Sequence, residues 1–255
     1  MQQYFVPEAR FNGNHVLLSG EDAKHITRVM RMNVSDPIIC ANDKGEAFLC
    51  KIEKFEGSNV VATVQSRLQS DPELPVKVVI VQGMPKGEKF DTIVRKGTEC
   101  GAAAFIPFYA ERSVAVWQKD RIEKKCLRLK KIAKEAAEQS HRLFIPEIME
   151  PVNLDQLLSI GETFTFKAVA YEETAKKGQV SALPSLLKQM KMGDSLLAVI
   201  GPEGGLTPKE AACFEENGFQ LCGLGPRIMR TETAPLYMLS AVSYQFELLN
   251  GEVEY

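Results

Sequence analysis

Hydrophobic and polar positions along the chain follow two different patterns. In the first 70 residues, short stretches rich in Val, Ile and Phe are separated by turn sequences such as NDKG at 42–45, a pattern typical of an all-β domain. One helix interrupts the strands, and Ser19 followed by Asp22 three residues later resembles the start of a capping box. These features predict a small β-barrel with strands at 15–18, 37–40, 47–53 and 59–65.

The pattern changes after residues 71–76, a polar stretch with two prolines that we interpret as a linker. From residue 77 onward, strand-sized apolar runs alternate with segments of helical periodicity, as in α/β domains built on a mainly parallel sheet. We therefore expect a β-barrel over 1–70 and an α/β domain over 77–255. The strands of the second domain are predicted at 78–82, 104–108, 166–170, 196–200 and 220–223, and its helices at 88–100, 120–140, 154–159, 183–191, 208–217 and 233–250.

Composition narrows the classes of protein to consider. Of the 255 residues, 45% are hydrophobic and 25% are charged, as in ordinary globular domains. The longest apolar runs fall far below the roughly 20 residues of a membrane helix, and the N-terminus lacks the segments of a secretory signal. The six cysteines form no C-x-x-C pair and have no finger-like spacing from the histidines. We therefore expect free thiols, no metal site, no membrane partner and a cytoplasmic location.

The net charge of the chain is only −2, but the charged residues are unevenly distributed along it. Residues 84–142 hold 14 Lys and Arg against 8 Asp and Glu, whereas residues 143–255 hold 8 against 15. The basic excess is compatible with a solvated helix face over residues 121–142, or with a surface for a polyanion such as a nucleic acid. Charge alone leaves both interpretations open.

A glycine-rich loop, GPEGGLTPKE at 201–210, follows the predicted strand at 196–200. Thr207 is suited to cap the next helix, Pro208 to open it and Glu210 to close a capping box. Three glycines let the backbone approach a ligand closely, and ligands of open α/β sheets bind at such loops. The spacing matches neither G-x-G-x-x-G nor G-x-x-x-x-G-K-[ST], which disfavours a nicotinamide-dependent dehydrogenase and a P-loop enzyme.

Three further segments place reactive side chains at predicted strand ends. Residues 223–235 hold two glycines, two arginines, a glutamate and two threonines. So many polar groups are costly to bury without partners. Helix capping by a threonine and pairing of an arginine with the glutamate would account for some of these polar groups. Residues 168–173 end a strand in a tyrosine and two acids, a weak signal by itself. Lys86 and Lys89 lie at the start of a helix, where anions are favoured, although solvation explains them equally well.

These loops resemble those of a known class of enzymes. VIGPEGGLT at 199–207 and LGPRIMRTETA at 224–234 are similar to the SPOUT class of knotted methyltransferases and, more narrowly, to the RsmE family. QYF at 3–5, HITRVMRM at 25–32, PKGEKF at 85–90, KGTECGA at 96–102 and AAEQSHR at 136–142 carry the resemblance over the whole chain. It implies a PUA-like RNA-binding barrel and an α/β SPOUT domain whose parallel sheet contains a C-terminal trefoil knot, a feature that sequence periodicity does not reveal.

The resemblance also implies an activity. RsmE enzymes are homodimers that transfer a methyl group from S-adenosylmethionine to N3 of a uridine in 16S ribosomal RNA, expected here to be uridine 1498 in the small ribosomal subunit. The last predicted helix, rich in apolar residues, is the implied dimer contact. The implied cofactor-binding residues, acting mostly through their backbone, are Ala170, Tyr171, Ile200, Gly201, Gly204, Gly205, Leu224, Gly225, Ile228, Met229, Arg230, Thr231, Thr233 and Ala234.

The chemistry of uridine assigns roles within the implied site. N3 carries a proton and becomes nucleophilic only after losing it, so catalysis needs alignment and help with one proton. Arg230 is the first choice to hold the uracil oxygens, Glu232 is the nearest candidate base and Glu203 the next, although the structure of its own loop explains Glu203 more simply. The residues expected to grip RNA phosphates are Arg28, Arg31, Lys86, Lys89, Arg112, Gln139 and Arg142.

Two other functions remain as alternatives. A SPOUT methyltransferase of different RNA specificity would share the knot but should lack the matches at 85–90 and 137–142. A non-enzymatic ribosome-assembly factor would bind RNA without needing the cofactor loops, and the intact GPEGG and RTETA sequences argue against it.

Overall fold

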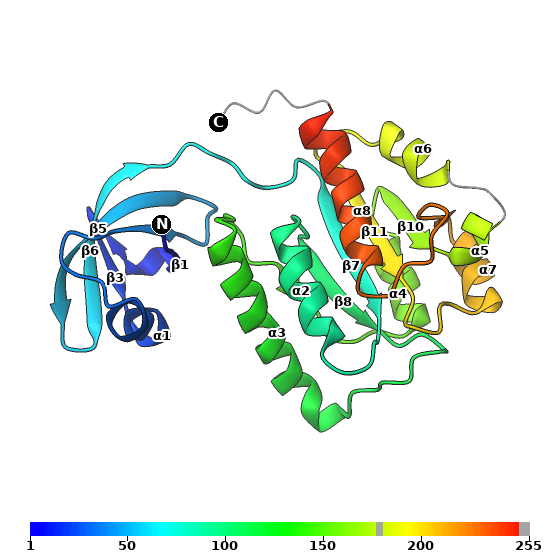
Figure 1. The fold of residues 1–255 in the computed structure, drawn as a ribbon, viewed down its shortest axis with the longest axis horizontal. Coiled ribbons are helices and arrows are strands. Elements are labelled where there is room, and N and C mark those ends of the chain that lie inside the picture. The colour runs from blue at the N-terminus through cyan, green and yellow to red at the C-terminus, as the bar shows by residue number, and fades with distance from the viewer. Residues whose placement is uncertain (177–180, 250–255) are drawn as a thin grey trace. The chain divides into compact units, whose positions relative to one another are not determined.

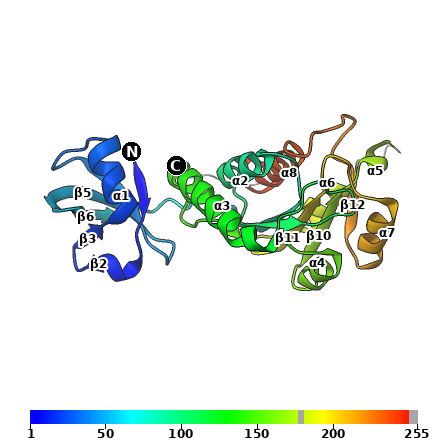
Figure 2. The same ribbon diagram turned by 90° about the horizontal axis from the view of Figure 1, so that it is seen from below.

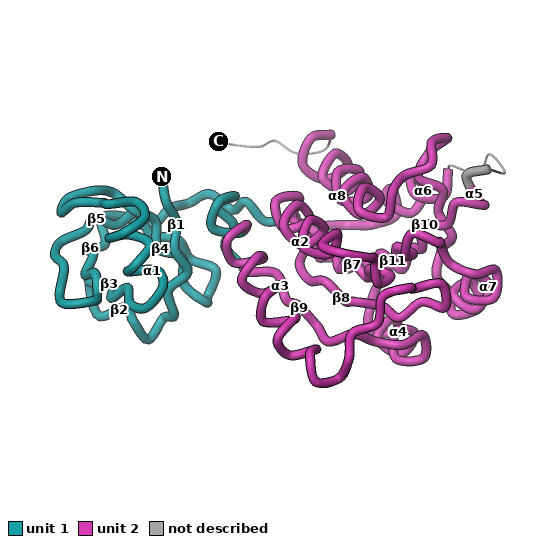
Figure 3. The backbone as a smooth tube through the Cα atoms, turned by 60° about the horizontal axis from the view of Figure 1, so that its bottom comes forward, with its two compact units in different colours: residues 1–73, 137–144 teal, residues 74–136, 145–255 magenta. Residues whose placement is uncertain are grey.

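The computed structural model describes residues 1–176 and 181–249 and consists of two compact units (Figure 3). The first contains Met1–Glu73 and Ala137–Phe144, and the second contains Leu74–Ala136 and the chain from Ile145 onward. The break after Glu73 falls inside the stretch interpreted as a linker. Residues 137–144, which the sequence pattern placed in the α/β domain, belong instead to the first unit.

The first unit is built on a six-stranded sheet in the order β1-β4-β5-β6-β3-β2. Strand β1 runs parallel to β4, and the remaining pairs are antiparallel. Strands β1 and β2 are the two ends of this order, and side chains of β1, β3, β4, β5 and β6 meet in one core. The elements are β1 (Gln3–Phe5), η1 (Glu8–Arg10), β2 (Phe11–Asn12), β3 (His15–Leu18), α1 (Gly20–Lys24), η2 (His25–Val29), β4 (Pro37–Ala41), β5 (Ala47–Glu56) and β6 (Asn59–Arg67).

Alternation of side chains explains this sheet. Val16 and Leu18 on β3, and Val60 and Ala62 on β6, are at most 1% exposed and point into one core, as expected for a sheet with one buried face. The four strands predicted from this alternation are confirmed, whereas β1 and β2 are too short to show it. The capping box predicted at Ser19 is wrong: Ser19 occupies the N-cap position with an extended backbone, but its side chain makes no capping hydrogen bond.

The second unit contains a six-stranded, fully parallel sheet in the order β12-β10-β11-β7-β8-β9. Its strands β7, β8, β10 and β11 are labelled in Figure 1. The predicted α/β class is therefore confirmed. Its strands are β7 (Lys77–Gly83), β8 (Ala104–Phe108), β9 (Glu147–Ile148), β10 (Phe166–Ala170), β11 (Ser195–Ile200) and β12 (Gln220–Cys222). Its helices are α2 (Lys89–Glu99), α3 (Lys119–Gln139, whose last turn joins the first unit), α4 (Leu154–Gly161), α5 (Glu172–Lys176), α6 (Ala182–Gln189), α7 (Pro208–Glu216) and α8 (Ala234–Ser243), followed by η3 (Tyr244–Leu248).

Helices cover both faces of this sheet (Figure 2). On one face Ile80 and Ala198 pack in a core with residues of α2, α3, α6 and α8, and on the other Val81 and Val199 pack with residues of α4 and α7. The strands are therefore apolar on both sides, which is why they appear in the sequence as continuous hydrophobic runs.

The predicted strands and helices of this unit are present, with ends shifted by a few residues. Two elements were missed: β9 has only two residues, and α5 starts at Glu172, where the sequence indicated an ordinary strand end. The long helix predicted at 233–250 begins at Ala234 and passes into a π-helical turn that ends at Leu248. Asn250 lies outside the described residues.

Candidate active site

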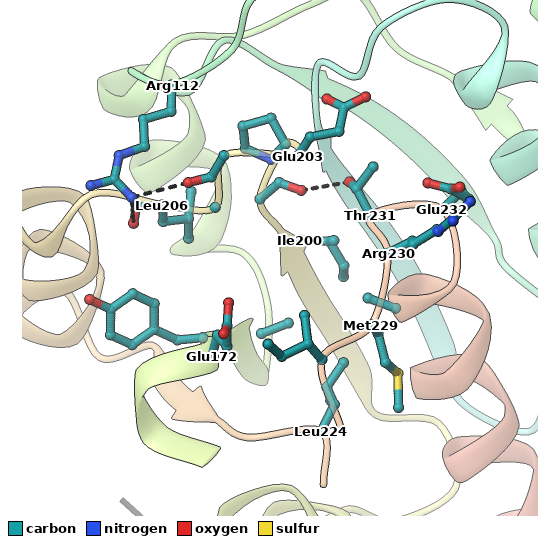
Figure 4. A pocket seen from close by; sticks show the side chains of 18 of the residues that line it. Arg112, Glu172, Ile200, Glu203, Leu206, Leu224, Met229, Arg230, Thr231 and Glu232 are labelled. Atoms are coloured by element: carbon teal, nitrogen blue, oxygen red, sulfur yellow. Dashed lines mark hydrogen bonds between the residues drawn. The ribbon is translucent and has the colours of Figure 1, made fainter. Parts of the chain in front are cut away.

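A cavity of about 560 Å³ lies at the carboxyl ends of three strands of the second unit. Strand β10 pairs in parallel with both β11 and β12, so the chain leaves Ala170, Ile200 and Cys222 at the same edge of the sheet. The segments that follow form most of the wall (Figure 4), at the place where α/β proteins bind ligands. The cavity residues are Lys89, Arg112, 170–173, 200–206, Pro208, 224–225, 227–232 and Ala234.

The glycine-rich loop after β11 is fixed at its far end by a capping box. Thr207 Oγ1 accepts a hydrogen bond from the Glu210 N–H at 3.2 Å, and Glu210 Oε2 accepts one from the Thr207 N–H at 2.8 Å. This confirms the cap predicted from the sequence. Near the other end the loop passes close to β7, because a Cβ at Gly83 would lie 2.5 Å from the backbone nitrogen of Pro202. Glycine is therefore required at 83 by close backbone approach.

The loop before α8 is attached to the same region by a buried network that the sequence analysis missed. Thr231 Oγ1 donates to the Gly201 carbonyl at 2.7 Å, and Gln82 Nε2 donates to Thr231 Oγ1 at 2.8 Å and to the Gly83 carbonyl at 3.0 Å. Gln82 is 0% exposed, and its Oε1 has no hydrogen-bond partner. The only indication of this network in the sequence was the amide side chain of Gln82 at the end of the apolar run VKVVIVQ.

Arg112 lies against the glycine-rich loop. Its Nη1 donates to the Gly204 carbonyl at 3.0 Å and reaches the Leu206 carbonyl at 3.5 Å (Figure 4). The segment that carries Arg112 is held by the buried Glu210 carboxylate, whose Oε1 accepts from the Glu111 N–H at 2.8 Å. Arg112 was expected at RNA phosphates, and the structure gives it a further role in shaping the cavity wall.

Four charged side chains gather on the other part of the wall, where Glu203, Arg230 and Glu232 are labelled in Figure 4. Lys89 Nζ is 2.8 Å from Glu203 Oε1 and 3.7 Å from Glu232 Oε2. Partial burial acts to raise the pKa of Glu203, but hydrogen bonds from Lys89 and from the Lys86 N–H outweigh it and lower that pKa below its ordinary value. Glu232 Oε2 is buried and has no hydrogen-bond partner.

The structure brings together nearly all the residues that the sequence assigned to a cofactor. Of that set, only Thr233 is outside the cavity residues; it is exposed at the N-cap of α8 and makes no side-chain cap bond. All three candidate catalytic residues, Arg230, Glu232 and Glu203, line the cavity. The cavity residues outside the predicted sets are Glu172, Glu173, Pro202, Leu206, Pro208 and Arg227.

The residues expected to contact RNA are divided between the two units. Lys86 and Arg112 in the second unit are exposed, as are Arg28, Arg31 and Gln139 in the first. The prediction that Arg142 contacts RNA is wrong. Arg142 is 4% exposed, and its guanidinium forms hydrogen bonds with both carboxylate oxygens of Glu73. A buried arginine already paired in this way is not available to a phosphate, and it instead fastens residues 137–144 to the rest of the first unit.

The cysteines form no disulfide. The six cysteines are free thiols, four of them buried, and burial raises the pKa of Cys222 to about 12. Among residues 1–176 and 181–249, no group of three or more His, Cys, Asp or Glu side chains is arranged to hold a metal ion. No helix in the described part of the chain is long and apolar enough to cross a membrane.

Comparison with known proteins identifies the family. Residues 72–243 match the model of an RNA methyltransferase domain, and residues 18–65 match that of an RNA methyltransferase PUA domain. The chain is 46% identical over 255 residues to the ribosomal RNA small subunit methyltransferase E of Bacillus subtilis, covering 99% of this chain and 100% of that one. The chain belongs to the ribosomal RNA small subunit methyltransferase E family. The first unit is thus PUA-like and the second is the methyltransferase domain of this family.

Solved structures of methyltransferase E proteins and similar chains have the same fold. The methyltransferase E of Neisseria gonorrhoeae, bound to S-adenosylmethionine, is 26% identical with a TM-score of 0.81, covering 96% of this chain and 98% of that chain. A methyltransferase of Legionella pneumophila, in complex with the same cofactor, is 28% identical with a TM-score of 0.80, covering 94% and 96%.

Proposed function

We propose that this protein uses S-adenosylmethionine to methylate N3 of a uridine, expected to be uridine 1498, in the 16S RNA of the small ribosomal subunit. The observation that carries the proposal is the cavity in which all three predicted cofactor loops meet. Family membership supports the methyltransferase activity and the RNA substrate, and solved relatives that contain S-adenosylmethionine support the cofactor. Action on ribosomal RNA is consistent with a location in the cytoplasm.

The cavity fits the cofactor in size and chemistry. Its volume of about 560 Å³ lies within the roughly 300–1,000 Å³ typical of sites for small ligands. Ile200, Leu224 and Met229 offer apolar surface to the adenine, while the backbone around Gly201 and Gly225 offers polar groups without side chains in the way. When bound there, S-adenosylmethionine supplies an electrophilic methyl group on a sulfonium.

Three charged side chains of the cavity have different roles in the proposed reaction. Arg230, exposed and lining the cavity, holds the uracil oxygens and stabilises the negative charge that develops as N3 loses its proton. Glu232 is the base, because its Oε2 is a buried acceptor that forms no hydrogen bond. Glu203 has a structural role, because its Oε1 already accepts hydrogen bonds from Lys89 and from the Lys86 N–H.

The finer features of the fold are part of the same proposal. The strand order β12-β10-β11-β7, together with the hydrogen bonds of Thr231 and Gln82 to Gly201, supports a trefoil knot around the cofactor loops. The exposed apolar side chains of α8 and η3 support a homodimer contact: Tyr237, Tyr244 and Leu248 are 40%, 56% and 67% exposed. Burial of such a patch by a second subunit would remove apolar surface from water.

The test is calorimetric titration with S-adenosylmethionine, followed by methyl transfer to small subunits that lack the modification. Binding with formation of 3-methyluridine is the expected result. Binding with a different methylated nucleoside would favour a SPOUT enzyme of other RNA specificity. RNA binding without cofactor binding would favour a non-enzymatic assembly factor.

A further inference from the structure

Lys89 was expected to contact RNA phosphates, but in the structure its partly exposed ammonium is engaged by two carboxylates of the cavity wall. It forms a hydrogen bond with Glu203 Oε1 at 2.8 Å and lies 3.7 Å from Glu232 Oε2. These carboxylates come from the loop after β11 and the loop before α8, and Arg230 is the other charged group that acts on Lys89. The hydrogen bond with Glu203 is the largest effect on the pKa of Lys89 and raises it, so the side chain remains a cation.

The two carboxylates that share this cation are not equivalent. Glu203 also accepts from the Lys86 N–H at 3.0 Å, so its charge is well satisfied. Glu232 has an oxygen that is buried and without a hydrogen bond. A buried acceptor that forms no hydrogen bond is unfavourable, and a ligand that brings an N–H donor relieves the cost. The imide N3–H of uridine is such a donor.

We propose that Lys89 is a positioning residue for methyl transfer: its ammonium offsets the repulsion between Glu203 and Glu232 and holds the Glu232 carboxylate ready to accept the N3 proton. This inference rests on the proposed function. In the step that it serves, the proton moves from N3 to Glu232 Oε2, the N3–CH₃ bond forms, and the S–CH₃ bond breaks with its electron pair left on sulfur. Lys89 acts through Glu232 and takes no part in the proton transfer.

The experiment compares Lys89→Met, Lys89→Arg and Lys89→Met/Glu203→Gln with the wild type in single-turnover methyl transfer at saturating RNA and cofactor. Lys89→Met should lower the rate roughly 10- to 100-fold, part of the 10²–10⁴-fold effect typical of general acid–base catalysis. Lys89→Arg should recover most of the rate because it keeps the charge. The double variant should be faster than Lys89→Met, since removing the Glu203 charge removes the repulsion. Arg95→Met, an exposed charge on the same helix α2, is the matched control and should match the wild type.

RNA binding distinguishes this role from a phosphate contact. For Lys89→Met, the Kd for RNA and its salt dependence should remain those of the wild type, as should the Kd for S-adenosylmethionine. If the maximal rate is unchanged while RNA affinity falls and the salt slope decreases by about 1, Lys89 is a phosphate contact and the inference is wrong. Loss of cofactor affinity together with rate, or no recovery in the double variant, would reduce Lys89 to a structural role. Failure of the wild type to bind S-adenosylmethionine would remove the proposed function itself.

Discussion

Replacement of Thr231 by valine tests whether the buried network with Gln82 builds the cofactor site. Valine has nearly the same shape but lacks the hydroxyl, which donates to the Gly201 carbonyl at 2.7 Å and accepts from Gln82 Nε2 at 2.8 Å. In the variant, the Gly201 carbonyl would keep only the longer contact with Gln82 Nε2, at 3.3 Å. The glycine-rich loop and the loop before α8 would lose their shortest direct hydrogen bond.

The size of the effect follows from the burial of these groups. Thr231 is 7% exposed and Gln82 is 0% exposed, so water does not readily replace the lost partners. A hydrogen bond contributes about 0.5–1.5 kcal/mol, and because two are lost we expect the free energy of unfolding to fall by about 1–3 kcal/mol. The cofactor must restore this part of the cavity wall when it binds, and we expect that to cost about 1.4 kcal/mol of binding free energy. Because 1.4 kcal/mol corresponds to a factor of ten in an equilibrium constant, the Kd for S-adenosylmethionine should rise about tenfold.

Chemical denaturation measures the stability and calorimetric titration measures the affinity. Thr98→Val is the matched control, because Thr98 is 0% exposed and its hydroxyl donates to the Val94 carbonyl at 2.7 Å within helix α2, outside the cavity residues. The control should lose a similar amount of stability and keep its cofactor affinity. A Thr231→Val protein whose Kd stays within twofold of the wild type would refute the reasoning, as would an equal loss of affinity in Thr98→Val.

The remaining predictions concern other parts of the site. Arg230→Ala should lower methyl transfer at least about 100-fold, as loss of an oxyanion contact does, with little change in cofactor Kd; unchanged turnover would remove its assigned role. Gly83→Ala should cost about 1–3 kcal/mol by overpacking, because the added Cβ would lie 2.5 Å from the Pro202 nitrogen; denaturation checks this. The lowered pKa of Glu203 stabilises the fold above the ordinary carboxyl pKa, and this contribution is lost as the pH falls through the lowered value. Glu203→Gln should flatten that acidic part of the stability profile, and an unchanged profile would contradict it.

The sequence by itself determined the elements that local chemistry specifies. Apolar runs buried on both faces marked the strands of the parallel sheet, and Thr207 with Glu210 marked the start of α7, because the donor and the acceptors of a capping box lie three residues apart. The loops that line the cavity were predicted in the same way, since glycines and polar residues at strand ends are local signals. Elements of two or three residues, such as β9 and β1, were missed because they are too short for periodicity.

Only the tertiary structure decided which distant groups meet. Gln82 and Thr231 are 149 residues apart, Lys89 and Glu203 are 114 apart, and Arg142 and Glu73 are 69 apart. Each pair joins segments that the sheet topology or the packing of a unit brings together, and no spacing along the chain encodes such a contact. A lysine or arginine therefore has the same appearance in the sequence whether its charge faces solvent, as for Arg28, or is paired inside the protein, as for Arg142.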